Sequence, residues 1–134
     1  MKRAPTAPPR FAVGIDLGTT NSALAFADLA GGGGIEDFRI LQVVAPGETA
    51  RLDTLPSFHY EAAAGEAGRG TFDLPWTAGH ATVAVGAGAR DLGALAPGRL
   101  VASAKSWLCH AGVERRARIL PWHGAEDVAR LSPV

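Results

Sequence analysis

Residues 14–22 concentrate the polar groups of this chain that could bind phosphate, and they read Gly-Ile-Asp-Leu-Gly-Thr-Thr-Asn-Ser. Gly14 and Gly18 carry no side chains, so an anion could approach the backbone, and a tight turn lets successive N–H groups point at one anion. The two threonines and the asparagine add hydroxyl and amide groups that can contact phosphate oxygens. The string predicts a polyphosphate-binding hairpin.

Asp16 lies inside this string at the end of an apolar run, where an uncompensated carboxylate is costly. A hydrated Mg²⁺ ion would compensate it, because Mg²⁺ keeps several waters and takes one or two carboxylates together with phosphate oxygens. The alternative is that Gly, Thr and Asn serve turn geometry alone, as they do in most Gly-Thr-Thr turns. The full string between two apolar segments favours the phosphate site.

Other nucleotide signatures are missing from the sequence. It contains no Gly-x-x-x-x-Gly-Lys-Ser/Thr loop, and no Gly-x-Gly-x-x-Gly opens a helix after the first apolar run. The four histidines lack the paired spacing of a zinc site, and the single cysteine, Cys109, excludes an internal disulfide. We expect Cys109 to be a small buried side chain.

Composition and charge limit the function classes. Hydrophobic residues make up 47% of the 134 residues, which is enough for a core. Thirteen Lys and Arg balance thirteen Asp and Glu, so we expect no nucleic-acid partner and no attraction to an anionic membrane. No apolar run reaches the roughly 20 residues of a membrane span, and prolines interrupt the N-terminus where a secretory signal needs apolar residues. The predicted location is cytoplasmic.

The elements that must position the turn follow from apolar patterning and turn residues. We expect a flexible tail over residues 1–10 and a folded part over 11–134 that belongs to the α/β class, with an early β-hairpin sheet followed by inserted helices. The predicted strands cover residues 11–15, 22–27, 35–44, 55–60 and 82–85, with an edge at 119–122. The predicted helices cover residues 86–96 and 99–110, and residues 61–81 form a loop.

Residues 14–22 resemble the first phosphate motif of the DnaK-type heat-shock chaperones, which belong to the superfamily of actin, sugar kinases and heat-shock ATPases. Sugar kinases and actin share the Asp-x-Gly turn but usually lack the following Thr-Thr-Asn-Ser. Residues 55–57, Leu-Pro-Ser, resemble the family's Thr-Pro-Ser strand, and residues 85–86 its Val-Gly before a helix. Lys105 is similar to the lysine of its Lys-Arg-Leu-Ile-Gly segment. The four segments occur in the family's order.

The resemblance implies an incomplete actin-like, ribonuclease H-like ATPase lobe that binds ATP or ADP with Mg²⁺. Asp16 would hold Mg²⁺ through water, and Lys105 would orient the attacking water and stabilise charge on the transferred phosphoryl group. The phosphates would be bound by Gly18, Thr19, Thr20 and Asn21. By pattern alone, Lys105 could instead be a surface lysine on an amphipathic helix. Ser-Trp-Leu-Cys follows it where the family has Arg-Leu-Ile-Gly, which favours a divergent bacterial branch.

The sequence is expected to be the N-terminal fragment of such a chaperone, because no second phosphate hairpin follows. In the full-length parent, ATP hydrolysis would be coupled to protein folding during stress, with client proteins and co-chaperones bound through regions outside this chain. The fragment alone should bind nucleotide weakly and should not hydrolyse ATP at a useful rate, since a phosphate clamp needs two opposed hairpins. Two alternatives stay open: a fragment of a related sugar kinase, and a non-catalytic protein-interaction module of the same fold.

Overall fold

A computed structural model describes residues 8–134 of the chain. The protein is mixed α/β, with mostly antiparallel sheets and a few short helices. In chain order its elements are β1 (Phe11–Leu17), β2 (Asn21–Asp28), β3 (Glu36–Asp37), β4 (Ile40–Ala45), β5 (Glu48–Leu52), β6 (Leu55–Pro56), β7 (Phe58–Glu61), β8 (Val83–Val85), α1 (Ala87–Leu95), the 3-10 turn η1 (Pro97–Arg99), β9 (Leu100–Ala102) and α2 (Ala104–Trp107). Residues 1–7 of the predicted tail lie outside the described residues.

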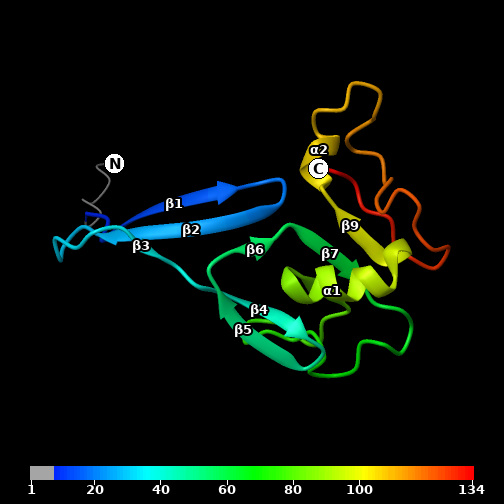
Figure 1. Ribbon diagram of the computed structural model, residues 1–134, viewed down its shortest axis with the longest axis horizontal. Coiled ribbons are helices and arrows are strands. Elements are labelled where there is room, and N and C mark those ends of the chain that lie inside the picture. The colour runs from blue at the N-terminus through cyan, green and yellow to red at the C-terminus, as the bar shows by residue number, and fades with distance from the viewer. Residues whose placement is uncertain (1–7) are drawn as a thin grey trace, which may run out of the picture.

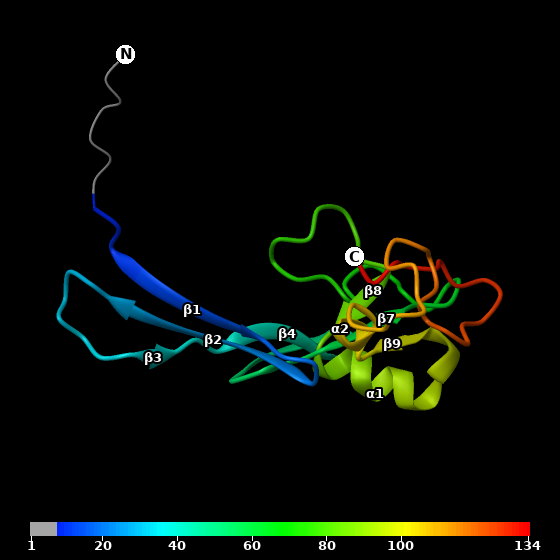
Figure 2. The same ribbon diagram turned by 90° about the horizontal axis from the view of Figure 1, so that it is seen from above.

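The first two strands form the predicted hairpin. β1 pairs antiparallel with β2 along its whole length, from Phe11 opposite Asp28 to Leu17 opposite Ser22. The strands are longer than the apolar runs, and Arg10, at the end of the predicted tail, extends the pairing through an ion pair with Asp28 at 3.0 Å. Figures 1 and 2 show that the hairpin projects from the rest of the molecule and that only its tip approaches α2.

The predicted strand over residues 35–44 is two separate strands. β3 pairs with β2, whereas β4 pairs with β5 in a second hairpin. The chain leaves the first sheet after the Phe38 N–H donates to the Leu24 carbonyl at 2.9 Å. β5 was not predicted, because charged and small residues dominate its five positions and give no apolar run. The predicted strand 55–60 is also divided: Ser57 separates β6, which pairs with β2, from β7.

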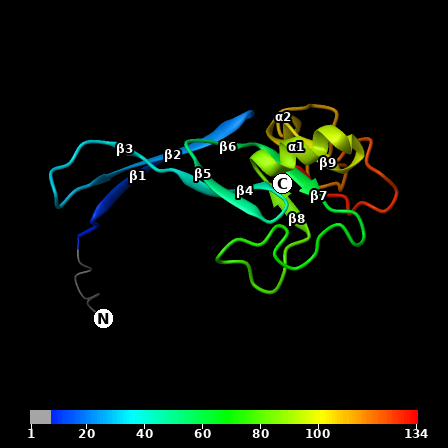
Figure 3. The same ribbon diagram turned by 60° about the horizontal axis from the view of Figure 1, so that its bottom comes forward.

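The body of the protein is built around β7, which pairs antiparallel with β8 on one side and β9 on the other. Helix α1 forms where the sequence predicts it and packs on β4 and β7. The predicted loop between β7 and β8 extends on the side of the body away from α1 (Figure 3). The buried core lies between the helix and this loop, and it consists of Val43, Tyr60, Phe72, Ala84 and Ala89.

The predicted helix over residues 99–110 is wrong. Residues 100–102 form β9 instead, in which Val101 is buried and pairs with His59 of β7. Helix α2 then covers only four residues. Apolar residues in this segment fit a helical spacing, but pairing with the open side of β7 outweighs that local preference.

Three smaller expectations can be compared with the structure. The edge strand expected at residues 119–122 is reduced to one isolated antiparallel bridge, between Leu120 and Leu131. Cys109 is exposed, so the expectation that it is buried is wrong. Within residues 8–134, no helix is both long and apolar enough to cross a membrane.

Candidate functional site

The turn of the β1–β2 hairpin is tightly folded and held from outside. A Cβ atom at Gly18 would lie only 2.2 Å from the carbonyl oxygen of Asn21, so the turn excludes any side chain there. Ser57 fixes the turn in two ways: its hydroxyl donates to the Gly18 carbonyl at 2.9 Å, and its N–H donates to the Thr20 carbonyl at 2.8 Å. The predicted hairpin turn and the predicted Leu-Pro-Ser segment are therefore in contact.

Lys105 reaches the same turn from a distant part of the chain. Its ammonium group donates a hydrogen bond to the carbonyl oxygen of Leu17, the last residue of β1. An ammonium group has three N–H donors, so this contact leaves donors for a ligand. The side chain is exposed, as an anion-binding lysine at a surface cleft requires.

Two features of the body place Lys105. Ser103 adopts a left-handed conformation with φ 52°, which ends β9 and starts α2 toward the hairpin. Because a four-residue helix has little stability of its own, α2 needs an outside anchor. Trp107 of α2 supplies it by stacking on Trp122, with the ring centroids 5.1 Å apart.

A cleft of about 330 Å³ lies between the hairpin tip and α2. Two of the predicted site residues, Gly18 and Lys105, line it together. The lining is completed by Leu17, Ser57, Ala104, Leu108 and Pro133. Its volume is in the range of small-ligand pockets, which begins at about 300 Å³.

The other predicted phosphate ligands are not among the residues that line this cleft. Thr19 and Thr20 are exposed at the bend, and Asn21 is exposed at the start of β2, opposite Pro56. Gly14, in contrast, is not part of the turn. It lies in the middle of β1 opposite Ala25, and a Cβ atom there would have ordinary contact at 4.0 Å, so the expectation that Gly14 opens the backbone to a ligand is not met by the local geometry.

Asp16 lines a different cavity from Lys105. This cavity, of about 230 Å³, has three acidic residues in its lining, Asp16, Asp37 and Asp53. Asp53 is also paired with Arg39 at 3.2 Å. Among the described residues, no three His, Cys, Asp or Glu side chains converge closely enough to hold a metal ion. The arrangement does not fit an ion held directly by a protein cage, and the hydrated ion at Asp16 stays an expectation.

The fourth segment singled out in the sequence has a structural role away from the cleft. Gly86 precedes α1 with φ 93°, and a Cβ atom there would lie 2.4 Å from Oε1 of Gln42. The Gln42 side chain accepts a hydrogen bond from the Ala87 N–H at 2.9 Å and donates one to the Thr54 carbonyl at 2.9 Å. Gly86 is thus required for the packing of the helix start.

Among residues 8–134, the groups with shifted pKa values lie outside the cleft. Arg10 lowers the pKa of Asp28 through a side-chain hydrogen bond, and backbone N–H groups of Ala81 and Gly70 lower the pKa of Asp73. Burial, together with a hydrogen bond to Glu66, raises the pKa of Tyr60 to about 12. These groups hold loops and the core together.

Sequence reasoning missed two kinds of site residue. Ser57 was part of a recognised segment but had no predicted role, because its contact with Gly18 joins residues 39 positions apart. Asp37 and Asp53 were not singled out. Their distance from Asp16 in the sequence hides the cavity that the three residues line.

Comparisons of the chain with known protein families, curated proteins and solved structures give no match. What the structure itself defines is a glycine turn with exposed hydroxyl and amide groups, a lysine anchored beside it, and a nearby carboxylate on a separate cavity. The functional conclusion therefore depends on the chemistry of these residues.

Proposed function

We propose that the hairpin turn and Lys105 bind the polyphosphate of Mg-ATP and form one half of the ATPase site of a DnaK-type heat-shock chaperone. The observation that supports this is convergence at the turn: Lys105 donates to Leu17, and Ser57 donates to Gly18. Each of these contacts joins segments that are distant in sequence and that separately resemble that family.

The residues around the turn suit a polyanion. Backbone N–H groups and threonine hydroxyls can donate to phosphate oxygens, and the Lys105 ammonium adds positive charge that can stabilise a developing phosphoryl charge. Asp16 lines a separate cavity, from which it would hold Mg²⁺ through water, and the ion, when bound, would neutralise charge on the phosphates. The exposed hydroxyls of Thr19 and Thr20 and the exposed Asn21 amide would orient the phosphate chain.

The same proposal covers the fold and the biological role. We assign the chain to the actin-like, ribonuclease H-like lobe of a larger ATPase, an assignment supported by the long antiparallel hairpin that carries the phosphate turn. In the whole protein, ATP hydrolysis in the cytoplasm would drive the folding of client proteins with the help of co-chaperones. The remaining phosphate and adenosine contacts would come from residues outside this chain.

A titration followed by NMR tests the proposed site. Adding Mg-ATP to the ¹⁵N-labelled chain should shift the amide signals of residues 18–21 and of Ser57, with a Kd in the millimolar range, about 4 kcal/mol of binding free energy. Mg-AMP should give weaker shifts, because the polyphosphate is the group recognised. The substitution Lys105→Met keeps an apolar stem and should weaken the binding of Mg-ATP by about tenfold, the effect of losing one charge-assisted hydrogen bond.

Arg116→Ala is the matched control, because it removes an exposed cation from the loop that follows α2. It should leave the Kd unchanged. If Arg116→Ala weakened binding as much as Lys105→Met, Mg-ATP would be interacting with exposed cations in general. If the shifts mapped to residues away from the turn, the proposed site would be wrong. Submicromolar affinity or steady hydrolysis by the isolated chain would contradict the proposal that this is only half of a site.

A further inference from the structure

β1 forms the long, unprotected edge of the first sheet. Among the described residues it pairs with β2 alone, and its outer side is open in Figures 1 and 2. The other edge of this sheet is formed by β3 and β6, which have only two residues each, and shortness is one way in which proteins prevent unwanted pairing. β1 has seven residues in one continuous register and contains neither the lysines nor the prolines that usually protect an edge.

Hydrogen bonds at the hairpin ends show which residues of β1 direct their backbone groups outward. The Leu29 N–H donates to the Arg10 carbonyl at 2.7 Å, so Arg10 faces β2. Because this direction alternates along an antiparallel strand, the even-numbered residues of β1 bond to β2 and the odd-numbered residues face the open edge. Leu17 follows this alternation: it is odd-numbered, and its carbonyl accepts a hydrogen bond from Lys105 and not from β2.

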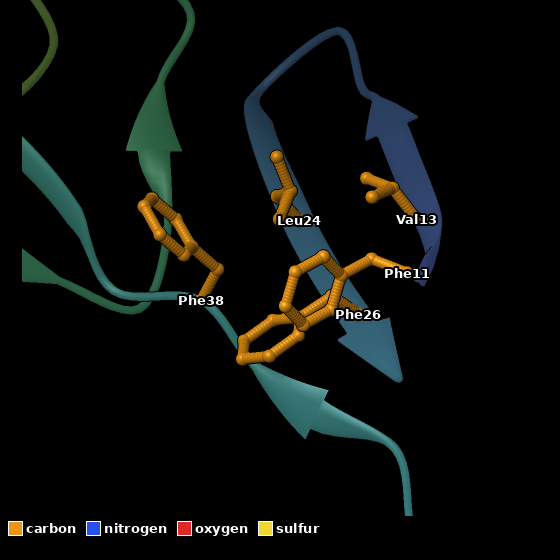
Figure 4. Close-up of a pocket in the computed structure, with 5 residues that line it drawn as sticks. All are labelled: Phe11, Val13, Leu24, Phe26 and Phe38. Carbon is orange, nitrogen blue, oxygen red and sulfur yellow. The ribbon is translucent and has the colours of Figure 1, made fainter. Parts of the chain in front are cut away.

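The side chains of the same odd-numbered residues form an exposed apolar face. Phe11, Val13, Ile15 and Leu17 are 45%, 57%, 62% and 65% exposed. The face continues onto β2 and Phe38, where it contains a groove of about 320 Å³ (Figure 4). In this groove Phe26 makes edge-to-face contacts with Phe11 and Phe38, at centroid distances of 6.0 and 6.4 Å.

We propose that β1 of the isolated chain pairs with β1 of a second copy, antiparallel and centred on Gly14, so that two sheets become one. In this register Val13 lies opposite the partner's Ile15, and both have outward N–H and C=O groups, so each such pair exchanges two hydrogen bonds. Phe11 lies opposite the partner's Leu17. Apolar side chains therefore meet apolar side chains on one face along the whole strand.

Charge selects this arrangement over the parallel one. β1 has one charged residue, Asp16, and in the antiparallel register it lies opposite the partner's Ala12. A parallel, in-register pair would bring the two Asp16 carboxylates side by side, which is destabilising. The chain has a formal net charge of zero, so two copies do not repel each other at long range. Because Lys105 occupies the Leu17 carbonyl, the central Val13 and Ile15 pairs supply the main hydrogen bonds.

Cysteine cross-linking tests the register. In a Cys109→Ser background, which removes the exposed native thiol, Gly14→Cys should form an intermolecular disulfide. Gly14 would face its own copy in a non-hydrogen-bonded pair, with Cα atoms about 4.5 Å apart, and a Cβ atom fits at this position. Ala12→Cys is the matched control: its two copies would be about 14 Å apart, so it should cross-link at least about tenfold more slowly. Equal rates would overturn the register.

Sedimentation equilibrium tests the pairing without a disulfide. The native chain should show a concentration-dependent species of twice 13.8 kDa, Ile15→Lys should abolish it, and Leu95→Lys should retain it. Both substitutions place lysine at an exposed apolar position, and Leu95, 85% exposed, lies on α1 away from the hairpin. A chain that is monomeric up to about 1 mM, a dimer that survives Ile15→Lys, or open-ended assembly would each overturn the proposal.

Discussion

At the scale of single residues, the hairpin turn depends on one glycine and a few carbonyl contacts. Gly18 has no space for a Cβ atom, and its carbonyl is held by the Ser57 hydroxyl. Gly14, four residues earlier, has ordinary surroundings. The two glycines of the motif therefore differ in their roles. Gly14 could be replaced by a residue with a side chain without a steric clash, whereas Gly18 is required.

The substitution Gly18→Ala should destabilise the hairpin by about 1–3 kcal/mol, because the turn must distort to move the Asn21 carbonyl away from the new methyl group. Gly14→Ala should change the stability by less than about 1 kcal/mol. Amide hydrogen exchange of β1 and β2 measures this local effect directly. Equal protection in the two variants would show that the close contact at Gly18 does not constrain the turn.

Tyr60 gives a second prediction at this scale, because it is the single tyrosine of the chain and is only 2% exposed. Burial and the hydrogen bond to Glu66, at 2.9 Å, raise its pKa to about 12. Near-ultraviolet absorbance should therefore show tyrosinate forming near pH 12 in the folded chain and near pH 10 in urea. Glu66→Gln should lower the folded value but not abolish the shift, since burial is the larger cause.

The sign of the linked stability change follows from these two values. The folded pKa is above the unfolded one, so the contribution of Tyr60 to stability is complete below about pH 10 and declines as the pH rises toward 12. Circular dichroism recorded in parallel checks whether the chain is folded at each pH. A midpoint near 10 in the folded protein would mean that Tyr60 is solvated.

At the scale of elements, α1 is stabilised by a residue from another strand and not by a local cap. Its N-cap residue is Gly86, which has no side chain to accept the free N–H groups of the first turn. Gln42 of β4, 1% exposed, takes that role through the Ala87 N–H. The start of the helix is therefore fixed by the second hairpin, and we expect α1 and β4 to unfold together.

Replacing Gln42 with leucine should cost about 1–3 kcal/mol, because it leaves the buried Ala87 N–H without its acceptor and also removes the hydrogen bond to the Thr54 carbonyl. Asp91→Asn, on the exposed side of the same helix, should change the free energy of unfolding by less than about 0.5 kcal/mol. Urea unfolding followed by far-ultraviolet circular dichroism measures both. Equal midpoints for the two variants would contradict a capping role for Gln42.

At the scale of the whole molecule, the first hairpin and the body are stabilised differently. The buried residues belong to the body, whereas β1 is exposed throughout and joins the body mainly at its tip. Continuous apolar runs such as those of β1 and β2 are typical of strands covered on both faces, but β1 has no such cover within residues 8–134. The hairpin should therefore open more readily than the body.

Hydrogen exchange should show faster exchange in β1 and β2 than in β7 at concentrations where the chain is monomeric. Ser57→Ala should increase exchange in the hairpin by about fivefold, the effect of losing one hydrogen bond of about 1 kcal/mol, and leave β7 unchanged. Ser106→Ala, at an exposed position on α2, is the control. Uniform protection across hairpin and body would mean that the molecule opens as one unit.

The sequence alone was sufficient for features whose cause is local. The two apolar runs and the turn residues between them predict the hairpin, and the alanine-rich stretch after Val85-Gly86 predicts α1. These elements follow because strand and helix patterns, together with Gly and Pro, act within a few residues. The chemistry of the turn could be read in the same way, although its function as a phosphate site stays a prediction.

Tertiary structure decided the rest, because the deciding contacts join distant residues. Residues 100–102 have a pattern compatible with a helix, but β7 offers a free side and they pair with it. That pairing, followed by the left-handed Ser103, brings Lys105 to the Leu17 carbonyl, 88 positions away in the sequence. Asp16 and Lys105 lie on different cavities for a similar reason. Local pattern determined which groups the turn has, and only long-range pairing determined which groups meet there.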